Sequence, residues 1–195
     1  MKSNSLNLLV DEFSKLPGIG RKTARRLAFH IIKVPGDQAK KLSQAIIDVK
    51  EKIKFCKVCG YITEEELCIF CRSDERDRKH ICIVENLNGV ISIEKTGSFK
   101  GLYHVLGGLI APTDGVGPSD IRLKELAGRI KRDNVTELLI AVPHTMKGDT
   151  TVFYMQKLFS DSGISVKFTR IAAGIPFGGD LEYIDRQTLL KSIEG

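Results

Sequence analysis

Apolar residues recur at helical spacing through the first third of the chain. The segments 5–15 and 21–33, and a third that runs from Pro35 to about Ile53, each place apolar residues three or four positions apart. This spacing predicts three helices, with turns at the Pro and Gly residues between them.

The pattern changes after residue 80. Four later runs are short and apolar: 81–84, 102–106, 137–142 and 166–171. Segments that can be helical lie among them, notably 119–132 and 150–161, and this alternation predicts βαβ units and a parallel sheet. The charged segment 72–79, RSDERDRK, joins the two parts and is expected to be a solvated linker.

The turn between the first two predicted helices has an unusual sequence, LPGIGRKTARR. Gly18 and Gly20 permit a sharp turn and leave no side chain in the way of a ligand. Because a helix begins directly afterwards, its free N–H groups and the positive end of its dipole suit a phosphate. Four cations follow at once: Arg21, Lys22, Arg25 and Arg26. The segment therefore predicts binding to a nucleic-acid backbone without recognition of base sequence.

The second predicted helix has two faces of different chemistry. At about 100° per residue, the cations fall in one stripe and the apolar residues on the opposite side. The stripe contains Lys22, Arg25, Arg26, Lys33 and Phe29, and the opposite face contains Ala24, Leu27, Ala28 and Ile31.

There are two other interpretations of this helix, and the role of one residue on it, Phe29, is open. It could be an ordinary surface helix with solvated charges. A nucleotide-binding P-loop does not fit, because Arg21 separates Gly20 from Lys22 and Thr23. Phe29 could stack on a base or pack against a second subunit, and we favour the subunit contact because aromatic residues are enriched at interface cores.

Charge is unevenly distributed along the chain. Between Lys15 and Lys54 there are 11 basic and 3 acidic residues, whereas the whole chain has a net charge of +6, so the remainder is slightly acidic. This asymmetry predicts a basic nucleic-acid-binding region attached to a near-neutral body. The first residues lack the apolar run of a signal peptide and no stretch approaches a membrane span, so we expect a cytosolic protein.

Four of the five cysteines are spaced for a metal. They form two Cys-x-x-Cys pairs with eight residues between them, Cys56 with Cys59 and Cys68 with Cys71. Two such pairs can close a tetrahedral four-thiolate site, which predicts one structural zinc ion with no position open for a catalytic water. A redox-active pair is the alternative, without a thioredoxin-like context to support it. Cys82 lies in an apolar run and is expected to be a buried small side chain.

Carboxylates also occur near the ends of two predicted strands. Glu85 directly follows the run 81–84, and Asp149 lies in the predicted loop after 137–142. Ligands of parallel sheets gather at this edge, and such carboxylates could hold Mg²⁺. Lys147 stands where a second carboxylate is expected, and its ammonium opposes a cation, which makes Mg²⁺ binding doubtful. His104 and His144 are expected to be structural, so the sequence does not support catalysis.

Three further motifs follow the glycine turn and the cysteine pairs: GLYHVLGG, GVGPSDIRLKEL and TRIAAGIPFGGDLEYID. Together with LPGIGRKTARRLAFHI and the two cysteine pairs, in this order, they resemble the RecR family of bacterial recombination mediators, and the resemblance covers nearly the whole chain. It implies an α+β multidomain protein with four parts. These are a helix-hairpin-helix DNA-binding region (1–55), a four-cysteine zinc finger (56–72), an α/β Toprim domain with a mainly parallel sheet (79–174) and a short C-terminal segment (175–195).

The resemblance also implies a function. Members of the family form dimers and ring-like tetramers able to encircle DNA, and they act with RecO and RecF. Together these proteins load RecA onto single-stranded DNA covered by single-strand-binding protein. The family's cationic DNA contacts match Lys22 and Arg26, its zinc ligands match the four paired cysteines, and its first Toprim acid matches Glu85. Its acid-Gly-acid run falls on 147–149, where Lys147 departs from the pattern.

Two other classes of function remain as alternatives. The first is a small Toprim-type metal-dependent DNA enzyme, which Lys147 disfavours. The second is a DNA-binding adaptor that works as a monomer.

Overall fold

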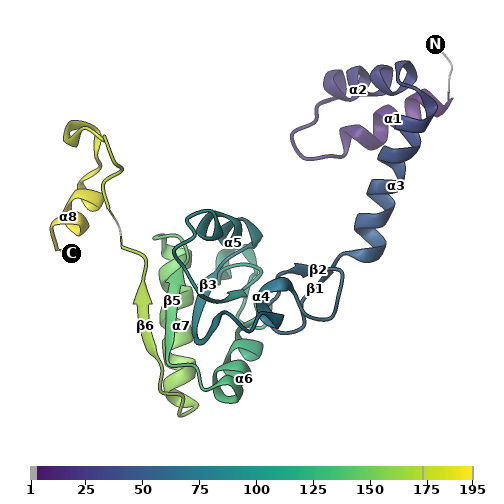
Figure 1. Cartoon of the computed structure of the whole chain (residues 1–195). Coiled ribbons are helices and arrows are strands. Elements are labelled where there is room, and N and C mark those ends of the chain that lie inside the picture. Colours follow the sequence, from purple (N-terminus) through teal and green to yellow (C-terminus); the bar gives the residue numbers. More distant parts are fainter. Residues whose placement is uncertain (1–3, 173, 195) are drawn as a thin grey trace. The chain divides into compact units, whose positions relative to one another are not determined.

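The computed structural model describes residues 4–172 and 174–194 (Figure 1). The chain forms two compact units. The first unit ends at Ile53 and the second begins at Lys54. Each helix of the described residues is too short or too polar to span a membrane.

The N-terminal unit consists of three helices: α1 (Asn4–Ser14), α2 (Arg21–Lys33) and α3 (Gly36–Lys52). Helices α1 and α2 pack on each other around three buried side chains, Val10, Ala24 and Ala28. The small alanine side chains on α2 let the two helices approach closely, and the larger side chains around them come from α1 and the turn. The predicted apolar face of α2 is therefore confirmed for Ala24 and Ala28, whereas Leu27 and Ile31 are half-buried.

Helix α3 forms where the sequence predicts it, but it buries no side chain. Its apolar positions Leu42, Ile46 and Val49 are 45%, 57% and 59% exposed. The helical period of α3 therefore does not build a core of the kind that α1 and α2 share.

A parallel sheet of four strands organises the second unit, as predicted. Its strands are β3 (Asp77–Val84), β4 (Gly101–Val105), β5 (Glu137–Ala141) and β6 (Lys167–Arg170). They lie in the order β4-β3-β5-β6, and every neighbouring pair is parallel. The helices that connect them are α5 (Leu87–Glu94), α6 (Leu123–Asp133) and α7 (Met146–Asp161), with a 3₁₀ turn η1 (Pro112–Asp114).

Short elements precede and follow the sheet. A two-stranded antiparallel hairpin, β1 (Lys54–Phe55) and β2 (Ile62–Thr63), and the helix α4 (Ile69–Arg72) carry the paired cysteines. A 3₁₀ turn η2 (Leu181–Tyr183) and the helix α8 (Arg186–Glu194) form the C-terminal segment. The α+β multidomain organisation implied by the resemblance is confirmed.

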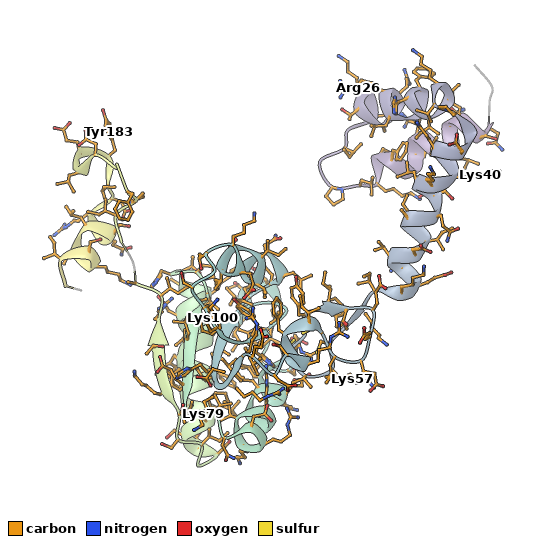
Figure 2. The ribbon with its side chains drawn as sticks, viewed as in Figure 1. Arg26, Lys40, Lys57, Lys79, Lys100 and Tyr183 are labelled. Atoms are coloured by element: carbon orange, nitrogen blue, oxygen red, sulfur yellow. The ribbon has the colours of Figure 1, made fainter. Side chains whose placement is uncertain are left out.

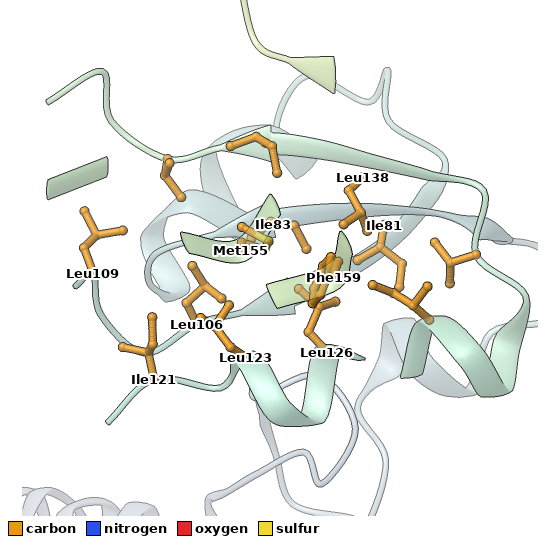
Figure 3. Close-up of a cluster of buried hydrophobic side chains, with 14 of the residues drawn as sticks. Ile81, Ile83, Leu106, Leu109, Ile121, Leu123, Leu126, Leu138, Met155 and Phe159 are labelled. Carbon is orange, nitrogen blue, oxygen red and sulfur yellow. The ribbon is translucent and has the colours of Figure 1, made fainter. Parts of the chain in front are cut away.

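Alternation along β3 supplies both faces of the sheet. Successive side chains of a strand point to opposite faces, so Ile81 and Ile83 enter one buried cluster and Cys82 and Val84 another. The first cluster contains side chains of α6 and α7, among them Leu126 (Figure 3). The second contains side chains of α5 and of the cysteine segment 54–73. The sheet is therefore covered on both faces, and the cysteine segment forms part of one cover.

The predicted solvated linker at 72–79 is wrong in its second half. Strand β3 begins at Asp77, inside that segment, and Arg76 just before it is anchored. The Arg76 guanidinium donates to both carboxylate oxygens of Glu94 at 2.9 and 2.7 Å and lies 4.6 Å from the ring centroid of Phe70. Charges that would suit a solvated segment are here paired with a carboxylate and an aromatic ring from other elements.

Two helix starts also differ from the predictions. Helix α6 begins at Leu123 rather than at 119, because 118–122 form turns. Helix α7 begins at Met146 rather than at 150, because the Thr145 hydroxyl accepts a hydrogen bond from Gly148 N and caps the earlier start. Asp149 therefore lies in the first turn of a helix and not in a loop.

The one fully buried histidine of the described residues is His104 on β4. Its Nε2 lies 2.7 Å from the carbonyl oxygen of Arg122, and its Nδ1 has no hydrogen-bond partner. Burial lowers the pKa of His104 from 6.5 to about 3, so the ring is neutral in the folded protein. This placement agrees with the structural role expected for this residue.

Because the unfolded chain takes up the His104 proton near pH 6.5 and the folded protein does not, acid favours unfolding. We expect the free energy of unfolding to fall between pH 6.5 and 3, with His104 contributing up to about 1.4 kcal/mol per pH unit. Urea unfolding of the wild type and of His104→Gln at several pH values measures this contribution. Identical pH dependence in both proteins would contradict it.

Candidate nucleic-acid interface and metal centre

The turn before α2 presents open backbone. Gly18 has φ +78°, a left-handed conformation that favours glycine, whereas Gly20 at the N-cap of α2 has an ordinary φ of −75°. A Cβ atom at either position would have no heavy atom within 4 Å, so the space beside both glycines is free. Gly18 is needed for the shape of the turn, and Gly20 contributes only the absence of a side chain.

The N-terminus of α2 is uncapped. It has no side-chain cap and no acidic residue in its first turn. The backbone N–H groups at this end and the positive end of the helix dipole therefore remain available to an anion. The sequence predicts this property, and the local backbone has the geometry that it requires.

The cationic stripe of α2 borders a shallow hollow of about 460 Å³. Arg26 is exposed on α2, where Figure 2 labels it. Among the predicted DNA contacts, Arg21 forms an ion pair, with 3.6 Å between its Nη2 and Asp11 Oδ1. Within the described residues, no carboxylate pairs with Lys22, Arg25 or Arg26. The hollow is lined by Lys22, Arg25, Arg26, Phe29, His30 and Lys33.

His30 is the lining residue that the sequence reasoning missed. It follows Arg26 by four positions and so lies on the same face of the helix, which was the signal that could have found it. Phe29 is 39% exposed at the same place. The structure thus gathers cationic, aromatic and imidazole side chains around one open surface.

The four paired cysteines meet in one buried cluster. Their Sγ atoms all lie within 4.8 Å of one another, with 3.4 Å between those of Cys59 and Cys68. The hairpin β1–β2 carries the first pair and α4 the second, and Gly60 N donates to Cys56 O at 2.9 Å in the tight turn between the strands. Within the described part of the chain, this is the single group of three or more His, Cys, Asp or Glu side chains placed to hold a metal ion.

The pKa values of Cys59, Cys68 and Cys71 are strongly shifted. Hydrogen bonding to Cys68 and Cys71, together with burial, raises the pKa of Cys59. For Cys71, the hydrogen bond with Cys59 acts downward, but that with Cys68 and burial raise the pKa to about 12. Hydrogen bonds from its neighbours lower the pKa of Cys68 to about 2. Without a cation the cluster favours few thiolates, so four buried sulfur ligands in this arrangement fit Zn²⁺, which holds all four deprotonated.

Cys82 is not one of the four cysteines placed to hold a metal ion, although it packs in the same buried apolar cluster. It is fully buried on β3, and burial raises the pKa of its thiol to about 12. The prediction that it is a buried small side chain is confirmed.

The cysteine segment is joined to the free edge of strand β4. Val105 N donates to Cys59 O at 2.7 Å, and the Phe70 ring packs edge-to-face against Tyr61 and Tyr103 at centroid distances of 5.1 Å to each. These contacts cover backbone groups of an edge strand that would otherwise be unpaired. Metal binding in this segment is therefore structurally linked to the sheet.

Asp149 and Asp114 each form an ion pair with a cation of the same chain. Asp149 Oδ1 accepts from Arg170 Nη1 at 2.7 Å, which lowers the pKa of Asp149. Lys147 Nζ lies 2.5 Å from Asp114 Oδ2 and lowers the pKa of that carboxyl group. Glu85 lies directly after β3 and lines a hollow of about 390 Å³ with His144 and nine other residues.

Gly148 separates these two ion pairs. A Cβ atom there would collide with the carbonyl oxygen of Pro143, so the backbone of the first turn of α7 requires glycine at this position. The same turn places Lys147 and Asp149 so that each reaches a different partner.

Comparison with known proteins decides the family. Three RecR family models match this chain: the RecR helix-hairpin-helix at residues 6–50, the RecR four-cysteine zinc finger domain at 53–73 and the RecR C-terminal segment at 174–195. A Toprim domain model matches residues 79–170. The recombination protein RecR of Cutibacterium acnes is 45% identical over 195 residues, which cover all of this chain and 96% of that protein.

The chain belongs to the RecR family. The helix-hairpin-helix model of that family covers the open turn and the cationic stripe of α2, and the zinc-finger model covers all four clustered cysteines. The Toprim model covers the parallel sheet from residue 79 of β3 onward, together with Glu85 and Asp149. DNA binding and zinc binding thus follow from the family and from the geometry together.

Proposed function

We propose that this protein is a cytoplasmic DNA-binding recombination mediator that acts as a ring-like homodimer or homotetramer. It acts with RecO, and with RecF, to help load RecA onto single-stranded DNA covered by single-strand-binding protein. The observation that carries the proposal is the open turn of α2 and its cationic stripe, for which the described residues supply no carboxylate partner, in a chain whose helix-hairpin-helix, zinc-finger and C-terminal regions match RecR family models.

The DNA contacts in this proposal are made to phosphates. They involve the backbone at Gly18 and Gly20 and the side chains of Arg21, Lys22, Arg25 and Arg26. Such contacts position a protein on DNA without specifying a sequence. A mediator that has to act on any exposed strand needs this property.

A closed assembly supplies the affinity that one chain lacks. A single patch that neutralises a few phosphates binds non-specifically in the range of about 10⁻⁴–10⁻⁶ M. Several patches held on one assembly raise the effective concentration of each later contact. The exposed Phe29 and the exposed apolar side chains of α3 offer surface for such an assembly.

In this proposal the protein has no catalytic residue. Glu85 and Asp149, near the carboxyl ends of β3 and β5, are the remnant of a Toprim metal site. The argument rests on the ion pairs of Asp149 with Arg170 and of Asp114 with Lys147, which place two cations where Mg²⁺ would need free carboxylates. Titration with Mn²⁺ followed by electron paramagnetic resonance is expected to show no bound ion at millimolar metal. Tight binding would favour the alternative of a Toprim-type metal-dependent DNA enzyme.

The zinc complement belongs to the same proposal. One structural Zn²⁺ per chain is held by Cys56, Cys59, Cys68 and Cys71. When bound, the ion ties together the two cysteine pairs and supplies no open coordination position.

Mass measurement with and without DNA tests the proposed assembly. Light scattering at micromolar protein is expected to give a mass of two or four chains of 21.6 kDa, and gapped DNA is expected to stabilise the larger species. A mass of one chain in both conditions would rule out the clamp and leave the monomeric adaptor. A closed oligomer that does not bind gapped DNA would instead contradict the DNA-binding role.

A further inference from the structure

A buried arginine from the α/β part lies against the cysteine cluster. Arg129 on α6 is 2% exposed, and its Nη2 lies 3.9 Å from Cys71 Sγ, although 58 residues separate the two in sequence. Its Nη1 donates to the Tyr103 carbonyl oxygen on β4 at 2.7 Å. One guanidinium thus touches both the edge strand of the sheet and a cluster sulfur.

The negative charge available to Arg129 from other groups is limited. Asp133 Oδ2 lies 3.5 Å from Arg129 Nε, but that nitrogen has no hydrogen bond in acceptable geometry. Both carboxylate oxygens of Asp133 accept instead from Arg132, at 2.7 and 3.0 Å. A buried guanidinium with one neutral carbonyl acceptor and a shared carboxylate remains under-compensated.

The metal centre has the opposite charge. Zinc with four thiolates carries more negative than positive charge, and burying that excess is costly unless nearby groups offset it. Backbone N–H groups offset part of this charge: Tyr61 N donates to Cys59 Sγ at 3.4 Å, and the backbone N–H groups of Phe70 and Cys71 donate to Cys68 Sγ. Arg129 is the cationic side chain that hydrogen-bonds to a cluster sulfur within the described residues.

We propose that Arg129 is a positioning residue of the zinc centre, whose guanidinium neutralises the Cys71 thiolate and couples the zinc affinity to the fold of the sheet. Groups outside the ligand set commonly change metal affinity by about 10–100-fold. Arg129 suits this role because its planar fork reaches Tyr103 O and Cys71 Sγ at the same time.

The test compares full-length Arg129→Gln and Arg129→Lys with the wild type. Zinc affinity is measured by competition with a chelator of known affinity. The Co²⁺-substituted proteins report the sulfur-to-metal charge-transfer band. We expect Arg129→Gln to weaken zinc binding by about 10–100-fold and to move this band to longer wavelength, because the thiolate loses a stabilising cation. Arg129→Lys keeps the charge and is expected to show smaller changes in both.

Arg122→Gln is the matched control. Arg122 Nη2 donates to the backbone oxygen of Lys57 at 3.2 Å, so it contacts the cysteine segment without approaching a sulfur. Its substitution is expected to leave the charge-transfer band in place. The zinc content of the wild-type protein in the same measurement checks the metal site independently of Arg129.

Either of two results with Arg129→Gln would overturn the proposal. One is wild-type zinc affinity in Arg129→Gln, and the other is a loss of affinity with an unmoved charge-transfer band, which would make Arg129 a mere anchor between α6 and β4. Should Arg129→Gln fail to fold with excess zinc, Arg129→Lys decides. Because an ammonium cannot reach both partners at once, this variant should lose about threefold or more in affinity, and wild-type affinity would refute the coupling.

Discussion

Cys68→Ala is expected to abolish zinc binding and to unfold the cysteine segment. Cys68 Sγ lies 3.4 Å from Cys59 Sγ. Removal of this thiol leaves three sulfur atoms, which cannot complete a four-coordinate site. Structural zinc contributes on the order of 10 kcal/mol to the folding of such segments. Because Phe70 and Cys59 also contact β4, the loss is expected to reduce the stability of the sheet edge as well. Metal analysis and urea unfolding measure both effects.

Cys82→Ala is the control for this experiment. Cys82 is as fully buried as the four paired cysteines but is not among the residues placed to hold a metal ion. Its substitution is expected to keep one zinc per chain and to cost about 1–2 kcal/mol, as expected for the loss of a small buried side chain. A well-folded, zinc-free Cys68→Ala protein would contradict the structural role of the metal.

The double variant Lys22→Ala and Arg26→Ala is expected to lose most of its DNA binding. Both side chains line the hollow on α2 and have no carboxylate partner among the described residues, so their charge is available to phosphates. We expect the affinity for single-stranded DNA to fall about tenfold or more at low salt. The slope of log affinity against log salt should also fall by roughly 0.7 for each lost contact. Fluorescence anisotropy over a range of salt concentrations measures both.

A matched control removes the same charge elsewhere in the unit. Lys40 and Lys41 are exposed on α3, and Lys40 is labelled with Arg26 in Figure 2. Lys40→Ala with Lys41→Ala is expected to change affinity only slightly, with folding and zinc content intact in both double variants. Equal losses in the two double variants would indicate a non-specific charge effect, and unchanged affinity in the first would move the DNA contacts to another surface.

The structure also changes how the acids of the Toprim region are interpreted. From the sequence, Lys147 alone argued against a metal, through its own charge. In the folded chain Lys147 is paired with Asp114, and it is Arg170 that engages Asp149. The sequence could not reveal these partners, because 33 residues separate Lys147 from Asp114 and 21 separate Asp149 from Arg170.

The sequence by itself determined the features that depend on neighbours along the chain. The cysteine spacing predicted which four cysteines lie together, the Pro-Gly-Ile-Gly turn predicted the uncapped N-terminus of α2, and the helical period predicted its cationic and buried faces. Only the tertiary structure decided the pairing of Arg76 with Glu94 and of Arg129 with Tyr103 and Cys71. Turns and short metal loops are governed by local backbone geometry. The partner of a buried charge is set instead by which strands become neighbours in the sheet, and hydrophobic burial across the whole domain determines that order.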